Sequence, residues 1–371
     1  MRRGIIFSMF LLLYTGSVRS QVRLPECIEH KDVWTKTQKE QIFEHVRTFP
    51  VQTQLAFAFI ENGAVSFSGV ISENDTISVV DNRHKVFEIG SISKVFTASL
   101  LAALVVEGKL NLDDPVNDRL PFALKDSIRP TFRQLANHTS GLPRMPSNFD
   151  GGVPFDPANP YRNYSEDLLK DYLTRQMELI YQPGERSEYS NLGAGLLAYT
   201  LAKVTGLNYL QLLKKYLFSN YGMTASTTQR EDVASYMVSG LDQNGRETSS
   251  WDFSVLIGAG GILSTTEDMA QFAFAQFDES NRELKLTRIP TFEVNERLAV
   301  GLGWYIVRTS AETELYCHNG GTGGYSSSIA LDTNRANGVI ILSNVSAFHP
   351  ESPKIERLCF SLLQTIGDSS E

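Results

Sequence analysis

Strand-like and helix-like patterns occupy different parts of this 371-residue chain, and their order is the strongest constraint on its fold. Near the N-terminal end, LAFAFIENGAVSFSGV contains two strand-like runs joined at Asn62-Gly63, a strong hairpin signal. Between about 109 and 250, short helical patterns alternate with loops rich in Pro, Gly and Asn, notably at 165–180 and 192–218. Further strand-like runs follow at 303–308, 314–318, 327–331 and 338–344. This order predicts an α+β fold in which one antiparallel sheet, flanked by helices, is assembled from both chain ends around an inserted, mainly helical region.

The same patterns predict one composite domain over residues 21–371. Its α/β part covers about 21–108 and 258–371, and its helical part covers about 109–257. One helix is predicted over 36–48. A second carries Ser91 and runs to about Glu107, with Gly108 as its C-cap, and a third begins at Pro353. The length is long for one simple domain but suits a composite one.

The first twenty residues have the layout of a cleaved signal peptide. Arg2 and Arg3 precede the apolar run IIFSMFLLLY, and small residues at Val18 and Ser20 predict cleavage after Ser20. The alternative is an uncleaved membrane anchor, although the run is short for a membrane span. The sequence therefore predicts an exported protein, periplasmic or secreted.

Charge and cysteine content exclude several classes of partner. Cleavage would remove Arg2, Arg3 and Arg19 and no acidic residue, so the net charge of −8 becomes −11. This balance argues against nucleic acid or an anionic membrane surface as partner, and no later apolar run approaches membrane-spanning length. Three scattered cysteines, at positions 27, 317 and 359, allow one disulfide without defining its pair, and no metal-ligand spacing is present. The oligomeric state stays open.

The segment FEIGSISKVFTASL places Ser91 and Lys94 one helical turn apart in apolar surroundings. A serine hydroxyl is a poor nucleophile without an adjacent base, and residues i and i+3 share one helix face. Burial would lower the pKa of the lysine and allow it to act as that base. The spacing alone is weak evidence, because about one Ser-x-x-Lys arises by chance in a chain of this length.

A second candidate element is Tyr189-Ser190-Asn191, which follows a Pro-Gly turn and opens an apolar helix. A tyrosine phenol can relay a proton, and an asparagine amide can orient a substrate carbonyl. Tyr161-Arg162-Asn163 has the same Tyr-x-Asn pattern but lies in a loop rich in Pro and Asn. We interpret this second copy as surface.

A third element is HNGGTGGYSSSIAL, in which a predicted strand ends at His318 and glycines follow. Glycines allow backbone to approach a ligand closely, and backbone N–H groups there could form an oxyanion hole with the N–H of Ser91. The alternative is a glycine-rich hairpin with a solvated histidine. The other prominent histidine, His138 in NHTSGLP, is expected to stabilise a turn, with a catalytic triad as the less favoured alternative. No G-x-S-x-G is present, which excludes the nucleophile elbow of α/β-hydrolases.

These three elements, in this order, resemble the serine β-lactamase and penicillin-binding DD-peptidase superfamily. The likeness is greatest to class C β-lactamases and the related DD-peptidases and esterases. The superfamily signatures are Ser-x-x-Lys, Tyr-x-Asn and a basic residue before x-Gly, and here they are SISK at 91–94, YSN at 189–191 and HNG at 318–320. Blocks such as EGKLNLDDPV, FRQLANHTSGLP and GAGGILSTTEDMAQF follow the family order over about residues 50 to 345.

The resemblance implies a role for each matching residue. Ser91 would be the acylated nucleophile, Lys94 would activate it, Tyr189 would pass a proton to the leaving group, and Asn191 would hold the substrate amide. No metal or cofactor is implied.

The third motif, with His318, Asn319, Gly320 and Gly321, would bind substrate, and the N–H groups of Gly321 and Ser91 would form the oxyanion hole. His318 would anchor a substrate carboxylate or tune the tyrosine of the second motif. It stands where typical class C β-lactamases have lysine, and a neutral imidazole offers less charge to a carboxylate than an ammonium does.

The expected function is that of an exported serine hydrolase working through an acyl-enzyme at Ser91. Its substrate would be a small molecule or a peptide: a β-lactam, a D-amino-acid peptide or a small ester. One alternative is a penicillin-binding sensor that is acylated but does not turn over, and another is a scaffold without activity. The intact motifs count against the scaffold.

Overall fold

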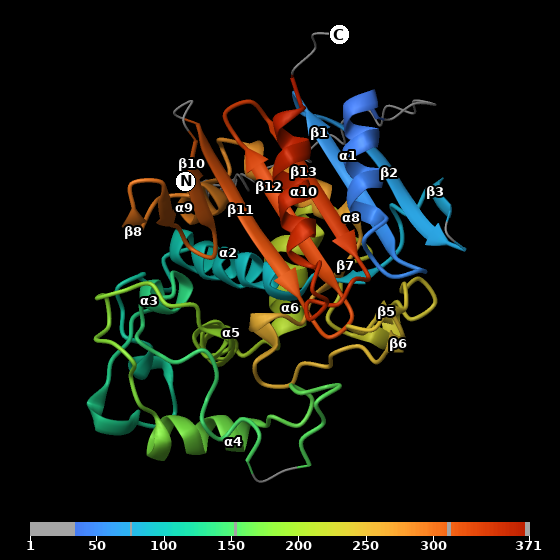
Figure 1. Cartoon of the computed structure of the whole chain (residues 1–371). Coiled ribbons are helices and arrows are strands. Elements are labelled where there is room, and N and C mark those ends of the chain that lie inside the picture. The colour runs from blue at the N-terminus through green and yellow to red at the C-terminus, as the bar shows by residue number, and fades with distance from the viewer. Residues whose placement is uncertain (1–33, 75, 152–153, 310–312, 368–371) are drawn as a thin grey trace, which may run out of the picture.

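A computed structural model describes residues 34–74, 76–151, 154–309 and 313–367 (Figure 1). Within them, one antiparallel sheet has the strand order β3-β2-β1-β13-β12-β11-β10-β9-β8. Its strands are β1 (Gln54–Glu61), β2 (Ala64–Glu73), β3 (Thr76–Val80), β8 (Phe292–Asn295), β9 (Leu298–Val300), β10 (Tyr305–Arg308), β11 (Glu314–Gly321), β12 (Ser326–Asp332) and β13 (Asn337–Ser343). Strand β1, near the N-terminal end of the chain, pairs with β13, near its C-terminal end, from Leu55 opposite Ser343 to Ile60 opposite Gly338. The prediction of an α+β fold with a sheet built from both chain ends is confirmed.

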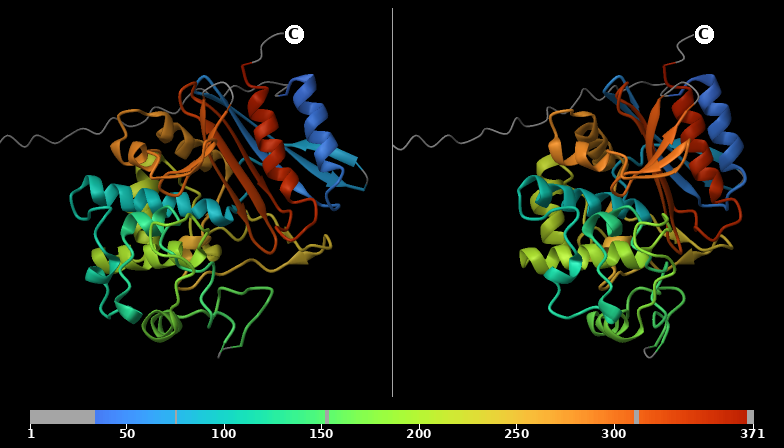
Figure 2. Two further views of the ribbon diagram at one scale, coloured as in Figure 1. Left: turned by 60° about the vertical axis from the view of Figure 1, so that its left-hand side comes forward. Right: turned by 90° about the vertical axis from the view of Figure 1, so that its left-hand side faces the viewer.

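Helices cover both faces of the sheet (Figures 1 and 2). Helices α1 (Lys36–Val46) and α10 (Pro353–Gln364) pack together on one face, and α8 (Thr266–Phe277) contacts β1 and β13 from the other. Strand alternation divides β1 between the two sides. Its residues 55, 57 and 59 join the core cluster that includes α1 and α10, whereas 56, 58 and 60 join the larger cluster. A strand buried on both faces is apolar at nearly every position, which explains the run LAFAFI.

The N-terminal hairpin forms as predicted, with Asn62 and Gly63 at φ +48° and +77°. Two other predictions need correction. The helical pattern at 192–218 is divided by Gly206, whose φ of +69° ends the first helix. The strand predicted to end at His318 continues to Gly321, because the residues after the histidine still pair with β12.

The remaining elements form the helical part and its connections to the sheet. Besides several short helical turns, they include η1 (Gly90–Ile92), a 3₁₀ turn, α2 (Ser93–Val106), α3 (Phe132–Ala136), α4 (Glu166–Asp171), α5 (Asn191–Thr205), α6 (Tyr209–Leu213), α7 (Ser219–Tyr221) and α9 (Arg282–Thr287), with the two-residue strands β4 (Phe87–Glu88), β5 (Gly240–Leu241), β6 (Glu247–Thr248) and β7 (Leu263–Ser264). Helix α2 is buried along nearly its whole length and contacts α5 and α9, so it joins the helical part to the rest of the molecule.

The predicted signal peptide and Cys27 lie outside the described residues. Among the residues that are described, no helix is both long enough and apolar enough to cross a membrane. Cys317 and Cys359 are buried and free.

Candidate active site

Ser91 lies in the η1 turn, between β4 and the start of α2. The preceding Gly90 has a φ of +50°, and a Cβ on it would lie 2.5 Å from the backbone nitrogen of Gly321. A Cβ on Gly320 would lie only 2.0 Å from the carbonyl oxygen of Ile89. The turn and the end of β11 therefore meet backbone to backbone, which only residues without a Cβ permit.

Lys94 lies one helical turn further on, in the first turn of α2, and its side chain is buried. Its Nζ donates to Ser91 Oγ at 3.0 Å and to the carbonyl oxygen of Ala259 at 2.6 Å. Both of these partners are uncharged. Burial, and to a lesser degree the positive charge of Arg144, hold the pKa of Lys94 well below its usual range. The sequence-predicted pair of serine and lysine is brought together in the form that general-base chemistry requires.

Tyr189 completes this group from the segment that precedes α5. Lys94 Nζ lies 4.6 Å from the centre of its ring, and the guanidinium of Arg144 lies 5.0 Å from it. Burial raises the pKa of the Tyr189 hydroxyl above its usual value, and a hydrogen bond with Ser91 offsets this only in part. Burial thus favours the neutral form of both groups, the protonated phenol and the unprotonated amine. Environments that push two pKa values apart in this way distinguish an acid from a base.

Asn191 is buried at the start of α5, where its Nδ2 donates to the hydroxyl of Tyr161 at 2.9 Å. Its Oδ1 has no hydrogen-bond partner among the residues that the structure describes, so it is free to accept from a bound amide. The interpretation of Tyr161 as a surface residue is wrong: its side chain is buried, and burial raises the pKa of its hydroxyl to about 12. The two Tyr-x-Asn segments therefore meet at one site.

His138 supports the same segment from the loop after α3. Its Nδ1 accepts the backbone N–H of Ser190 at 3.2 Å, and its ring centre lies 4.7 Å from that of Tyr189. The ring is buried, and burial together with the charges of Lys94 and other groups lowers its pKa well below the usual value. A neutral His138 thus fixes the orientation of the second motif, a contact beyond the local turn that the sequence predicted.

Of the four residues of the third motif, only the last three line the pocket. His318 is buried, its Nδ1–H donates to the carbonyl oxygen of Asn319 at 2.6 Å, and its Nε2 has no partner. Burial lowers the pKa of His318 to about 3, so the ring is neutral. Asn319, Gly320 and Gly321 line the pocket, whereas His318 does not. A direct contact between His318 and a substrate carboxylate does not fit this placement.

A family model described as Beta-lactamase matches residues 52–362, which is most of the chain. The chain belongs to the beta-lactamase family. The resemblance inferred from the three motifs is thereby confirmed.

Relatives and solved structures agree with this assignment. Beta-lactamase-like protein 2 of Dictyostelium discoideum is 31% identical over 234 residues, covering 59% of this chain and 40% of that protein. The chain thus spans well under half the length of that relative. The octameric penicillin-binding protein homologue from Pyrococcus abyssi is 26% identical, with a TM-score of 0.72 over 89% of this chain and 77% of that one. A class C beta-lactamase shares the fold, with a TM-score of 0.74 at 19% identity over 92% of this chain and all of that one.

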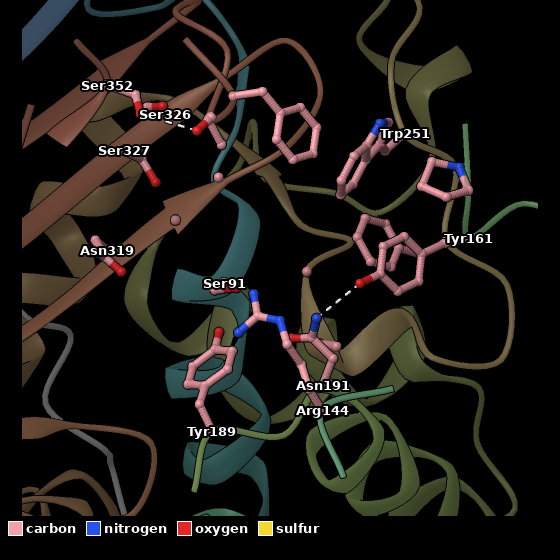
Figure 3. Close-up of a pocket in the computed structure, with 18 of the residues that line it drawn as sticks. Ser91, Arg144, Tyr161, Tyr189, Asn191, Trp251, Asn319, Ser326, Ser327 and Ser352 are labelled. Carbon is pink, nitrogen blue, oxygen red and sulfur yellow. Dashed lines mark hydrogen bonds between the residues drawn. The ribbon is translucent and has the colours of Figure 1, made fainter. Parts of the chain in front are cut away.

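In this family member, the three motifs open onto one pocket of about 700 Å³ (Figure 3). One wall is aromatic and consists of Phe149, Tyr161, Trp251, Phe253 and Phe348, whose rings contact one another. The wall opposite is formed by β11 and the start of α10. Figure 3 shows Ser91 between these walls, with Asn319 on one side and Trp251 and Tyr161 on the other.

Most residues that line the pocket were not predicted from the sequence, and four of them bear on its chemistry: Arg144, Tyr161, Trp251 and Glu356. Two of them follow or share a recognised pattern, since Arg144 comes directly after NHTSGLP and Tyr161 is in the second Tyr-x-Asn. The other two lie in segments without any motif, and no local signal marks them. Within the described residues, no group of three or more His, Cys, Asp or Glu side chains is arranged to hold a metal ion.

Proposed function

We propose that this chain is an exported serine hydrolase that forms an acyl-enzyme at Ser91 and cleaves amide or ester bonds. The observation that supports it most is the lysine of α2: its Nζ is buried, lacks a carboxylate partner and lies 3.0 Å from Ser91 Oγ. A buried amine with a lowered pKa is the base that a serine nucleophile needs.

Acylation begins when neutral Lys94 takes the proton of the Ser91 hydroxyl, and Oγ attacks the substrate carbonyl carbon. The backbone N–H groups of Ser91 and Gly321 stabilise the resulting oxyanion, an arrangement supported by the close contact between η1 and β11. The phenol of Tyr189 donates its proton to the leaving nitrogen or oxygen as the bond to the acyl carbon breaks. The proton held by Lys94 then restores the phenol.

Deacylation reverses these transfers with water in place of the leaving group. Water loses its proton to the Tyr189 and Lys94 pair, attacks the acyl carbon and releases the free acid, and Ser91 Oγ recovers its proton. The free Oδ1 of Asn191 accepts the N–H of an amide substrate and so orients the acyl group.

The substrate is an apolar acyl ester or amide, a D-amino-acid peptide or a β-lactam. The aromatic wall favours an apolar acyl group, because it offers rings rather than hydrogen-bond partners to one side of Ser91. Neutral, buried His318 offers no charge to a carboxylate, so penicillins are expected to acylate the serine slowly.

Intact-mass time courses test this function on wild type and Ser91→Ala. The mature protein is mixed with benzylpenicillin in one series and with 4-nitrophenyl phenylacetate in the other, and release of nitrophenol is followed in parallel. We expect turnover of the ester that depends on Ser91, or an adduct on wild type only. A lasting adduct without turnover would favour a penicillin-binding sensor. Equal behaviour of the two proteins with both probes would refute the proposal.

A further inference from the structure

Two charged side chains line the pocket within the described residues, Arg144 and Glu356. They take different positions. The guanidinium of Arg144 lies over the ring of Tyr189, beside the proposed proton-transfer group. Glu356 comes from the start of α10 and faces β11, where Asn319 Nδ2 donates to its Oε2 at 3.1 Å.

Glu356 forms no ion pair with another residue that the structure describes. Its hydrogen-bond partner is the uncharged amide of Asn319, and the neighbouring Lys354 is paired with Glu351 instead. His318, which precedes Asn319 on β11, directs its Nδ1–H to a backbone carbonyl oxygen and does not reach the pocket. The wall formed by β11 and α10 therefore presents a half-buried carboxylate held in place by a neutral hydrogen bond.

A group bound at this wall would lie on the opposite side of Ser91 from the aromatic rings (Figure 3). A substrate that reaches both walls must be apolar at one end. At its other end, a carboxylate would be repelled by Glu356, whereas a cation would be attracted to it.

We propose that Glu356, oriented by Asn319, is a specificity-determining residue that binds an alkylammonium group of the substrate. The preferred substrate is then an ester or amide with an apolar acyl group at the aromatic wall and a cationic leaving group at the β11 and α10 wall. This inference rests on the proposed acyl transfer at Ser91 and names the substrate class of that site.

Three phenylacetate esters with different alcohols isolate the effect of charge. The choline ester is cationic, the 3,3-dimethylbutyl ester is its neutral isostere, and the glycolate ester has a carboxylate. Hydrolysis is followed by acid release in a pH-stat, which needs no chromophore. We expect kcat/KM for the choline ester to exceed that of the neutral isostere about two- to fivefold, and the glycolate ester to be the poorest of the three.

Substitutions of Glu356 test whether its carboxylate causes the preference for the cationic ester. Glu356→Gln can still accept from Asn319 but lacks the charge, so the ratio between the choline ester and its isostere should fall to about one. Glu356→Lys should favour the glycolate ester instead. Glu351→Gln is the matched control, because it removes the same charge from a residue outside the pocket lining and should keep the wild-type ratio.

The outcomes separate the two proposals. Hydrolysis that depends on Ser91 but shows no charge preference, or a preference that survives Glu356→Gln, overturns the inference and leaves the serine hydrolase intact. If none of the three esters is hydrolysed in a way that depends on Ser91, the proposed function fails, and the inference fails with it.

Discussion

His138 and Tyr189 pack ring against ring, with their centres 4.7 Å apart, although 51 positions separate them in the chain. The histidine also accepts the backbone N–H of Ser190 through Nδ1 and has a φ of +62°, a backbone conformation that few residue types adopt readily. His138, which the sequence alone predicted only to stabilise a turn, thus holds Tyr189, the proposed proton donor, in place.

His138→Ala should lower kcat about 10- to 100-fold with a smaller change in KM, because Tyr189 loses its support. The substitution also leaves the Ser190 N–H buried without an acceptor, which costs about 1–3 kcal/mol of unfolding free energy. His138→Asn should recover most of that stability, since asparagine tolerates positive φ and offers an acceptor. Chemical denaturation and steady-state kinetics on both variants check this. Unchanged kcat in His138→Ala would show that the histidine has no positioning role.

Lys94→Met should abolish acylation and change how stability depends on pH. The pKa of Lys94 is lowered in the folded protein, so the unfolded chain binds a proton that the native state does not. Wild-type stability therefore falls as the pH drops below the unfolded value of about 10.4. The unfolding free energy of the variant relative to wild type should therefore be greater at pH 7 than at pH 10.

Urea denaturation at these two pH values measures that difference. A difference that does not vary with pH would mean that Lys94 is charged in the native state, and the general-base assignment would be lost. Wild-type acylation should correspondingly slow as the pH falls through the lowered pKa of Lys94.

Glu88→Gln should stabilise the protein at alkaline pH but not at acidic pH. Burial raises the pKa of Glu88 to about 7, and one of its oxygens accepts the backbone N–H of Trp251 at 2.9 Å. Between about pH 4.5 and 7 the unfolded chain loses this proton and the native state keeps it, so wild-type stability declines across that window.

The variant lacks that decline. Its unfolding free energy relative to wild type should therefore rise between pH 4 and pH 8, by as much as about 3 kcal/mol. Melting temperatures across this range provide the measurement, and parallel pH profiles for the two proteins would contradict it. Because Glu88 holds Trp251 in the aromatic wall, substrate binding should become less sensitive to pH in the variant.

Gly320→Ala should abolish activity and destabilise the protein by several kcal/mol. The new Cβ would lie 2.0 Å from the Ile89 carbonyl oxygen and 2.4 Å from Ser327 Oγ, so β11 must move away from the serine turn. Gly151→Ala is the control, because its nearest new contact is an ordinary 3.7 Å. Thermal unfolding and ester hydrolysis decide the outcome. Near-normal activity in Gly320→Ala would argue against an oxyanion hole between Ser91 and Gly321.

The sequence by itself determined the features that depend on residues close together in the chain. The alternation in LAFAFI, the Asn62-Gly63 turn and the i, i+3 spacing of Ser91 and Lys94 each involve a few consecutive residues, whose side chains are related by local backbone geometry. The order of strands and helices was also sufficient to predict a sheet built from both chain ends.

Only the tertiary structure decided what those residues face. Tyr161 was interpreted as a surface residue because it lies in a loop rich in Pro and Asn, yet folding brings its hydroxyl to 2.9 Å from Asn191 Nδ2. His318 matches the motif but is neutral and outside the pocket lining, and the charge at that wall belongs to Glu356 in a helix with no motif. Burial and charge at a site are sums over segments distant in sequence, and a local pattern contains no information about which segments will meet.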